Sequence, residues 1–316
     1  MGSLGIYVHV PFCVKKCNYC DFLSFPLKKE TDCRNTENYV KALQQEIRNP
    51  FKLPESPAEV DTIYIGGGTP SLLSEKQIGS ILDEINRKFL VKADAEITME
   101  CNPGTVTAES LRAYHDLGIN RLSIGIQSAV EKELALLGRI HTFSQAKQAV
   151  SWAREAGFTN LSVDLMSAIP GQTLASYEHS LREILALKPQ HISSYSLIIE
   201  EGTPFFERYK DNPPVDEETD RKMYEMTQQM LVDRGYERYE ISNYARPGYE
   251  SRHNTKYWTG EDYLGVGLGA SSKIGKFRLK NETDMTAYLE KLGKGETVAF
   301  VEENLSDEDE KIEFFI

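Results

Sequence analysis

Three cysteines near the start of the chain have the residue type and the spacing to bind a metal centre. Cys13, Cys17 and Cys20 form a C-x3-C-x2-C pattern within CVKKCNYC, directly after a short apolar run. A structural zinc ion and a complete [4Fe–4S] cluster each normally take four protein ligands. Three thiolates on a four-iron cluster leave one iron open, and a small molecule can chelate it. The spacing therefore favours an open [4Fe–4S] cluster.

Two other interpretations of these cysteines stay open on the sequence. One is a zinc ion whose fourth ligand is Cys33, Cys101 or His9, which would make the chain a zinc-stabilised binding module without redox chemistry. The other is three unligated thiols. A disulfide framework is disfavoured because the five cysteines are odd in number and three of them fall within eight residues.

The composition is that of a globular protein of about two domains. Of the 316 residues, 40% are hydrophobic and 27% charged, and the net charge is −12. A net-acidic chain without a basic cluster argues against nucleic-acid binding, because phosphate contacts need grouped Lys and Arg. No apolar run approaches the roughly 20 residues of a membrane span, and no basic segment of a signal peptide precedes the first apolar stretch. We expect a cytoplasmic protein with no more than peripheral membrane association.

The elements that must position the cysteines are short strands that alternate with helices. Six runs rich in β-branched and aromatic residues predict strands at 6–10, 62–66, 96–100, 122–126, 161–166 and 192–198. The segments between them have helical periodicity, with caps predicted at Thr107 and Ser144. Strands joined through helices pair in parallel with right-handed crossovers. The sequence thus predicts a barrel-like α/β fold.

The pattern changes after residue 200. A helix is predicted to begin at Asp216 and to carry a stripe of methionines, and it leads into mixed short elements. We therefore expect a barrel domain over 1–205 and an α+β extension over 206–316. Ser306 and Asp309 are spaced as a capping box before an apolar run that reaches Ile316 without a C-cap. The natural protein is accordingly expected to be longer, with a further domain after this point.

The cysteine motif, with Tyr19 before its last cysteine, resembles that of the radical S-adenosylmethionine (SAM) proteins. Over nearly the whole chain the sequence resembles one family of these proteins, the oxygen-independent coproporphyrinogen III oxidases. The matching segments, in the family's order, are YVHVPFC, IGGGTPSLL, ECNPGT, RLSIGIQS, GRIH and VDLMSAIPGQT. The resemblance implies a partial (β/α)6 barrel. It also implies a reduced cluster that passes one electron to SAM and so generates a 5′-deoxyadenosyl radical.

The resemblance also implies a set of SAM contacts. Backbone without side chains at the glycines can approach the methionine end of SAM, Arg139 can pair with its carboxylate, and Asp164 can accept from ribose hydroxyls. The expected SAM residues are Tyr7, Tyr19, Gly67, Gly68, Thr69, Glu100, Gln127, Arg139, Asp164 and Ile198, the last as an apolar wall near adenine. Taken singly, each also has a structural explanation, such as a tight turn at the glycines or a solvated strand end at Glu100.

Two departures from the oxidase pattern and one further motif move the resemblance toward the haem chaperone (HemW) branch of the family. Phe22 stands where the oxidase pattern has a fourth cysteine, and Cys13 lies too near Met1 for the N-terminal extension expected in the oxidase. His253, Asn254, Tyr257 and Trp258 lie in HNTKYW, which is similar to the HNxxYW motif that this branch associates with haem. An imidazole is a suitable axial ligand for haem iron. The alternative is a buried histidine whose loop packs on a tryptophan.

The expected function is that of a HemW-type radical SAM protein. It would hold a [4Fe–4S] cluster and SAM, receive electrons from a reducing donor, bind haem and deliver it to an acceptor haem protein. Two alternatives share most of these motifs: a coproporphyrinogen III dehydrogenase, whose decarboxylation the missing fourth cysteine makes doubtful, and a methyltransferase that uses two SAM molecules.

Overall fold

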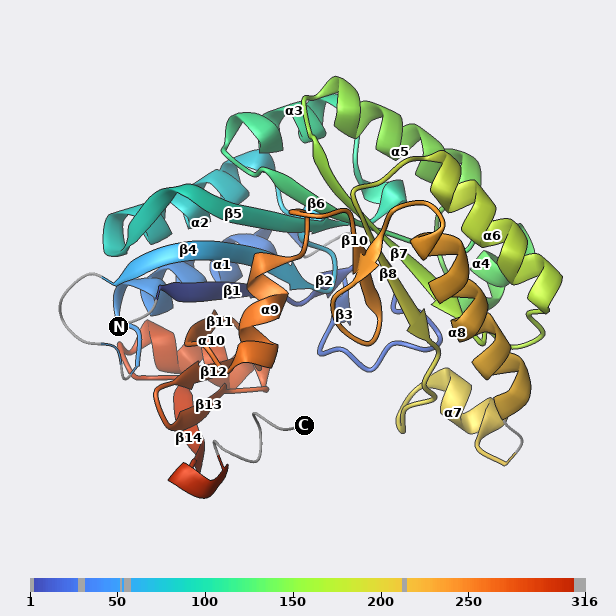
Figure 1. Ribbon diagram of the computed structural model, residues 1–316. Coiled ribbons are helices and arrows are strands. Elements are labelled where there is room, and N and C mark those ends of the chain that lie inside the picture. Colours follow the sequence, from blue (N-terminus) through green and yellow to red (C-terminus); the bar gives the residue numbers. More distant parts are fainter. Residues whose placement is uncertain (1–2, 28–31, 52, 54–57, 212–214, 310–316) are drawn as a thin grey trace.

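Six parallel strands form the centre of the fold, in the order in which they occur along the chain (Figure 1). The structure is a computed structural model that describes residues 3–27, 32–51, 53, 58–211 and 215–309. The central strands are β1 (Leu4–Val10), β4 (Glu59–Gly67), β5 (Leu90–Cys101), β6 (Arg121–Gln127), β7 (Asn160–Ser167) and β8 (His191–Ser196). Each pairs in parallel with the next. The predicted parallel α/β architecture is confirmed.

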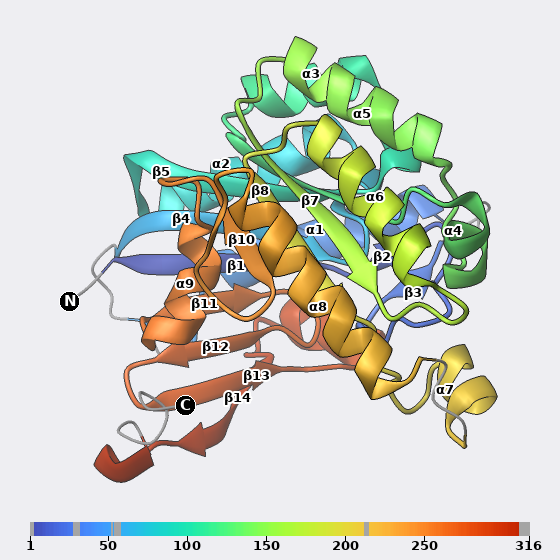
Figure 2. The same cartoon turned by 45° about the vertical axis from the view of Figure 1, so that its right-hand side comes forward.

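The connecting helices cover one face of this curved sheet (Figures 1 and 2). They are α1 (Asp32–Arg48), α2 (Glu75–Lys88), α3 (Ala108–Asp116), α4 (Glu131–Leu137), α5 (Phe143–Glu155) and α6 (Leu174–Ala186). Contacts between α1 and α2, α2 and α3, and α3 and α5 join four of these helices side by side. The sheet's other face is left for the site.

Two predicted caps have different outcomes. Thr107 caps α3, where its side chain accepts a hydrogen bond from the Ser110 amide. The predicted cap at Ser144 is wrong, because Thr142 caps α5 and forms a capping box with Gln145. Both Thr142 and Ser144 can cap a helix, but Gln three residues after Thr142 completes the reciprocal pair.

Alternation along each strand separates an apolar face from a polar one. On β6, Leu122, Ile124 and Ile126 are almost completely buried in the hydrophobic core beneath the helices. Arg121 and Ser123 point to the opposite face, because successive side chains of a strand alternate in direction. The inner face of the sheet is therefore a polar surface held by an apolar layer behind it.

The segments after residue 205 extend both edges of the same sheet. Strands β10 (Asn243–Ala245) and β9 (Glu237–Arg238) add antiparallel to β8. At the other edge β11 (Tyr263–Val266) pairs in parallel with β1, and β12 (Ser271–Ile274), β13 (Phe277–Asn281) and β14 (Ala299–Asn304) follow. The helices of this part are α7 (Pro204–Tyr209), α8 (Glu217–Val232), α9 (Arg252–Thr259) and α10 (Met285–Gly293). The division into domains at residue 205 stays a prediction.

A buried carboxylate fastens this extension to the barrel. Glu46 on α1 accepts hydrogen bonds from the Tyr288 hydroxyl at 2.6 Å, the Asn281 side-chain amide at 2.6 Å and the Gly267 backbone amide at 2.9 Å. Burial raises the pKa of Glu46 to about 7, although these bonds act in the opposite direction. The donors come from α10, β13 and the turn after β11, so one side chain holds three parts of the extension.

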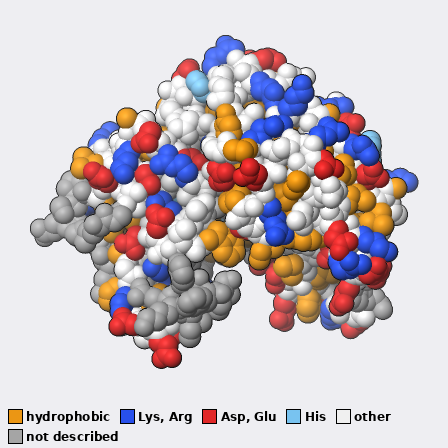
Figure 3. All heavy atoms as spheres, viewed as in Figure 1, with side chains coloured by type: hydrophobic (Ala, Val, Ile, Leu, Met, Phe, Trp, Pro, Cys, Tyr) orange, Lys and Arg blue, Asp and Glu red, His pale blue; other side chains and the backbone are white. Residues whose placement is uncertain are grey.

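The last described residues and the surface complete the fold. Ser306 and Asp309 form the predicted capping box, but the helix expected beyond them lies outside the described residues. Over the described ranges, no helix has the length and hydropathy of a membrane span. On the face seen in Figure 3, Lys and Arg side chains are interspersed with Asp and Glu side chains. This face accordingly has no continuous basic patch.

Candidate functional site

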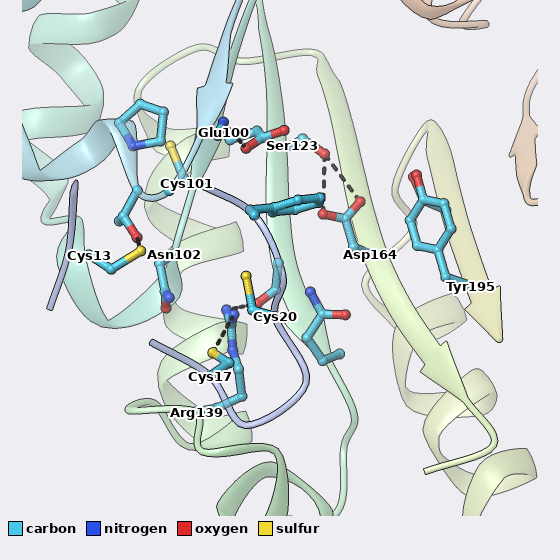
Figure 4. A pocket seen from close by; sticks show the side chains of 18 of the residues that line it. Cys13, Cys17, Cys20, Glu100, Cys101, Asn102, Ser123, Arg139, Asp164 and Tyr195 are labelled. Carbon is cyan, nitrogen blue, oxygen red and sulfur yellow. Dashed lines mark hydrogen bonds between the residues drawn. The ribbon is translucent and has the colours of Figure 1, made fainter. Parts of the chain in front are cut away.

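The three cysteines open onto a cavity of about 320 Å³ at the carboxyl ends of the parallel strands. Figure 4 shows the cysteines on one side of this cavity and Glu100, Ser123 and Asp164 on another. The loop that carries the cysteines lies between β2 (Phe12–Cys13) and β3 (Phe25–Pro26), a short parallel pair. Parallel α/β folds place ligands at this end of their strands.

The cysteine loop is fixed by backbone contacts at its start, middle and end. The Leu27 amide donates to the Cys13 carbonyl at 2.8 Å and closes the loop. In its middle, the Asn18 amide donates to the Leu137 carbonyl at 2.9 Å, and the Asn18 carbonyl accepts from the Phe205 amide at 3.0 Å. The loop is thus tied to the ends of α4 and α7, which holds the thiols over the cavity.

The thiols are free and face different partners. Thr69 Oγ1 donates to Cys13 Sγ at 3.6 Å, and Arg139 Nη1 donates to Cys17 Sγ at 3.8 Å. Burial raises the pKa of the Cys20 thiol to about 11. No group of three or more Cys, His, Asp or Glu side chains in the described part of the chain converges as the ligands of one ion would.

A glycine turn after β4 brings backbone to the cavity wall. Gly67 has a φ of +109°, and a Cβ there would lie 2.6 Å from the His9 ring. A Cβ at Gly68 would lie 2.6 Å from the Phe12 carbonyl oxygen, while the Gly68 amide donates to the Val10 carbonyl at 2.8 Å. Only glycine allows this close approach, and it leaves bare backbone exposed to a ligand.

Glu100 ends β5 inside this wall rather than in solvent. Its carboxylate accepts from the Tyr64 hydroxyl at 2.9 Å and from the Gly67 amide at 3.1 Å. Burial raises the pKa of Glu100 to about 7, with the negative charge of Asp164 acting in the same direction. The cavity therefore offers a carboxyl group that a cationic ligand would ionise.

Asp164 and Arg139 face the cavity from neighbouring elements. Ser123 Oγ donates to Asp164 at 3.2 Å, and burial raises the pKa of Asp164. Arg139 Nη2 donates to the Gly125 carbonyl at 2.6 Å, where a Cβ would lie 3.2 Å from the same nitrogen. The buried Arg139 Nε has no partner among the described side chains and backbone. A carboxylate from a ligand would suit this incomplete donor set.

The cavity brings together nearly all of the residues predicted to contact SAM. Those that line it with the three cysteines are Tyr19, Gly67, Gly68, Thr69, Glu100, Gln127, Arg139 and Asp164. Tyr7 instead lines two adjoining cavities. Ile198 was expected at the end of the sixth strand, which is wrong: β8 ends at Ser196, and the Ile198 side chain is 69% exposed. Its contact with adenine stays a prediction.

Several lining residues were missed by the motif analysis. They include Arg121, Ser123, Met166, Ser193 and Tyr195. Arg121 and Ser123 precede Gln127 by even numbers of residues on β6, so the two-residue period of a strand places them on the same inward face. That period was the available signal, and it extends the site deeper into the barrel than the motifs reach.

Comparison with known proteins decides the family. Residues 7–184 match the radical SAM superfamily. The chain is 43% identical over 276 residues to the heme chaperone HemW of Escherichia coli, covering 87% of this chain and 71% of the relative. It is 39% identical to HemW of Bacillus subtilis, covering 90% and 74%. This chain belongs to the radical SAM superfamily and, within it, to the HemW family.

A solved structure supports the same placement. The coproporphyrinogen III oxidase (HemN) of Escherichia coli, described as a radical SAM enzyme, superposes with a TM-score of 0.85 at 26% identity, covering 97% of this chain and 73% of the other. Membership of the radical SAM superfamily implies a [4Fe–4S] cluster and SAM. The glycine turn, the thiols without disulfides and the incomplete donors of Arg139 suit both groups.

The HNTKYW segment of this HemW-family chain forms most of α9, and its histidine is buried. His253 is 1% exposed, and its Nδ1 lies 2.9 Å from Thr62 Oγ1 while its Nε2 lies 3.0 Å from the Tyr257 hydroxyl. The Tyr64 ring stacks on the imidazole at 5.4 Å. Burial lowers the pKa of His253 to about 3, helped by the positive charge of Lys256. His253 is thus a neutral side chain held within the protein.

Charged groups of the barrel dock α9. Glu96 on β5 accepts from the amides of Arg252 at 3.2 Å and His253 at 3.1 Å at the helix N-terminus. The Lys256 ammonium, whose side chain is 3% exposed, lies 3.1 Å from Asp61 and 2.8 Å from Glu261. Within the HNTKYW segment, His253 and Lys256 therefore anchor the helix to the barrel.

The other half of the segment faces two further cavities. One, of about 440 Å³, is lined by Asn254, Tyr257 and Trp258 and shares Glu100 with the cysteine cavity. The other, of about 350 Å³, lies beside Tyr257 and His9. Tyr257 and Trp258 are 43% and 59% exposed. The motif residues that a ligand can reach are the amide and the two aromatic side chains.

Proposed function

We propose that this protein is a haem chaperone that binds haem beside its SAM cavity and passes it to an acceptor haem protein. The observation that carries the proposal is the aromatic cavity of about 440 Å³ at α9, which shares Tyr64, Glu100, Tyr195 and Asn254 with the cysteine cavity. A flat apolar macrocycle needs aromatic walls, and Trp258 provides one with an exposed ring. The heme chaperone names of the curated relatives support the same function.

The cysteine cavity would hold the other two groups. Cys13, Cys17 and Cys20 would ligate the cluster, and Arg139 would orient the carboxylate of SAM through its planar fork of donors. Asp164 would accept from the ribose, and Glu100 would face the cationic end of the ligand. When bound and reduced, the cluster supplies one-electron chemistry. We further propose a cytoplasmic location, with electrons supplied by a reducing donor.

A second candidate function is oxidative decarboxylation of coproporphyrinogen III, favoured by the structural match to HemN. Phe22 lines both the cysteine cavity and the cavity of about 350 Å³. It argues against the decarboxylation, because the oxidase pattern has a fourth cysteine at that position. Incubation of the reconstituted protein with coproporphyrinogen, SAM and a reductant separates the two. Loss of CO2 from the substrate would replace the chaperone proposal with the enzyme.

Haem titration of the anaerobically reconstituted protein tests the chaperone proposal directly. We expect stoichiometric binding and transfer of the bound haem to a haem-free acceptor protein. Trp258→Ala should weaken haem binding. Tyr224→Ala removes an exposed ring on α8 that does not line this cavity, and it should leave haem binding unchanged. Failure of the wild-type protein to bind haem would refute the proposal, and iron and sulfide analysis of the same sample reports whether the cluster assembled.

A further inference from the structure

We infer that Tyr257, rather than His253, supplies the axial ligand of the haem iron, and that His253 is a positioning residue for the Tyr257 hydroxyl. This inference rests on the proposed haem-binding function. It assigns the iron to a residue that lines two cavities. Haem proteins use tyrosine as well as histidine and cysteine for this purpose.

His253 is unsuited to bind iron where it stands. Both ring nitrogens have partners, Thr62 Oγ1 and the Tyr257 hydroxyl, and the side chain is 1% exposed. It lines none of the three cavities described above. To reach a ligand its ring would have to leave the Tyr64 stack and its contacts with Thr62 and Tyr257.

The space around His253 is shaped for a buried side chain. A Cβ at Gly5 on β1 would lie 2.9 Å from the Lys256 chain, 3.0 Å from Thr62 Oγ1 and 3.3 Å from the His253 ring. The absence of a side chain at Gly5 therefore lets α9 approach the strands. The imidazole fills this space, which has no room for a porphyrin.

The hydrogen bonds of Thr62 indicate which nitrogen of His253 carries the proton. Thr62 is completely buried, and in the described part of the chain its hydroxyl has one hydrogen-bond partner, His253 Nδ1. A buried hydroxyl proton that finds an acceptor avoids the cost of an unmade bond, so Thr62 donates to Nδ1. The neutral ring then carries its proton on Nε2 and donates it to the Tyr257 oxygen.

Tyr257 stands at the junction of two cavities. It lines both the cavity of about 440 Å³ and the one of about 350 Å³, together with Tyr7 and Glu100. Its ring is held edge-on by His253 at 5.4 Å and by Tyr263 at 4.6 Å. The phenol is thus fixed in orientation on the wall that a haem in either cavity would meet.

His9, the other histidine beside these cavities, is also engaged. Its Nε2 lies 2.9 Å from the Leu23 carbonyl, to which it must donate, and its Nδ1 lies 3.0 Å from the Tyr7 hydroxyl. The Nδ1 lone pair therefore accepts from Tyr7. Both nitrogens of His9 are thus engaged within the protein, as those of His253 are.

The ligation step is an exchange at ferric iron without a change of oxidation state. The Tyr257 O–H bond breaks, its proton passes to solvent water, and the phenolate oxygen forms a bond to iron(III) as a water ligand leaves. The Nε2–H of His253 remains a donor to that oxygen. A hydrogen bond to the phenolate stabilises its negative charge, and this is the positioning role that we infer for His253.

Titration with ferric haem, followed by absorption and electron paramagnetic resonance, tests the assignment. The wild type should show the high-spin spectrum and charge-transfer band of a ferric phenolate. Tyr257→Phe, which keeps the ring, should lose that band and bind haem at least tenfold more weakly. Tyr224→Phe is the matched control, because Tyr224 is 37% exposed compared with 43% for Tyr257 and lines none of the three cavities. It should keep the wild-type spectrum.

The positioning role of His253 has its own readout. His253→Gln should retain the phenolate band at a shifted energy, because the iron ligand stays while its hydrogen-bond donor changes. A wild-type spectrum in Tyr257→Phe, or a histidine-type spectrum that only His253→Gln abolishes, would overturn the assignment and leave haem binding intact. Absence of haem binding by the wild type would overturn the proposed function together with it.

Discussion

The cysteine loop and helix α9 both carry a short motif, but their side chains are used in opposite ways. In the cysteine loop the backbone makes the anchoring contacts, through Asn18 and the β2–β3 pair, and the motif side chains are left facing a cavity. In α9 two motif side chains, His253 and Lys256, are themselves buried among barrel residues and add to the anchor that Glu96 makes with the backbone. Asn254, Tyr257 and Trp258 are the motif side chains that face a cavity.

This difference shows that a motif residue suited to ligation need not ligate. A cysteine and a histidine are both good metal ligands, but burial and hydrogen bonding decide which is available. The cysteines keep free thiols beside a cavity, whereas His253 has both nitrogens satisfied. Four experiments test this contrast.

The largest effect should come from the cysteine loop. Cys17→Ser should abolish the cluster, because the loop offers three thiolates and a hydroxyl is a poor iron ligand. Iron and sulfide content after anaerobic reconstitution measures the loss. Cys101→Ser is the control, since Cys101 lines the same cavity on β5 outside the loop. An iron-loaded Cys17→Ser protein would remove the distinction between loop and strand cysteines.

The anchoring half of α9 should affect stability instead. Lys256→Met leaves Asp61 without its 3.1 Å partner, and breaking a buried ion pair from one side costs about 3 kcal/mol in the free energy of unfolding. Arg252→Met is the matched control, because Arg252 is 44% exposed and 3.8 Å from the same carboxylate, and should cost under about 1 kcal/mol. Denaturant unfolding measures both. Equal effects would contradict the anchoring role.

Arg139 should control SAM affinity without affecting the cluster. Arg139→Lys keeps the charge but loses the planar fork, which should weaken SAM binding about tenfold, or ~1.4 kcal/mol. Calorimetry on cluster-loaded protein measures the affinity, and iron content verifies that the loop is intact. An unchanged affinity would show that the guanidinium serves Gly125 and Cys17 alone.

The smallest effect separates two buried carboxyl groups by pH. Burial raises the pKa of Glu100 and of Glu46 to about 7, above the ordinary 4.5. Each folded-state group holds its proton more tightly than the unfolded chain does. The stability contributed is thus complete below about pH 4.5 and is lost as the pH rises through about 7. Binding of SAM should ionise Glu100 and so reduce the Glu100 contribution to the pH dependence of the free energy of unfolding, by about 1 kcal/mol between pH 5 and 8.

Variants assign that slope to each group. Glu100→Gln should reproduce the flattening without SAM, and SAM should then change the slope no further. Glu46→Gln should flatten the slope by its own share, while SAM continues to act on what remains. If SAM altered the slope of Glu100→Gln as strongly as that of the wild type, Glu100 would not face the cationic ligand. Thermal unfolding across the pH range provides the data.

The parallel strands and the cysteine cavity could be predicted because their signals are local. Runs rich in β-branched and aromatic residues located β1 and β4–β8, and parallel strands place their carboxyl ends together, so residues such as Glu100 and Asp164 line the same cavity. The cap of α5 was misplaced because two hydroxyl residues compete there and only the partner at Gln145 separates them. Ile198 was misplaced because an apolar run does not show where a strand ends.

The role of His253 could not be predicted from local signals. Its partners Thr62 and Glu96 precede it by more than 150 residues in the chain, and nothing in HNTKYW indicates which members point inward. The same holds for the strands after residue 205, which extend both edges of one sheet. Such pairings depend on long-range geometry that short motifs do not record.

Strand β5 carries both regions on one backbone. Glu96 holds the start of α9, and Glu100, four residues further on the same face, borders the SAM cavity. An extended strand rises roughly 3.3 Å per residue, so the two carboxylates are spaced by about 13 Å. A hydrogen-bonded strand neither stretches nor shortens, so it keeps this spacing fixed. The distance between the start of α9 and the edge of the cysteine cavity at Glu100 is consequently set during folding.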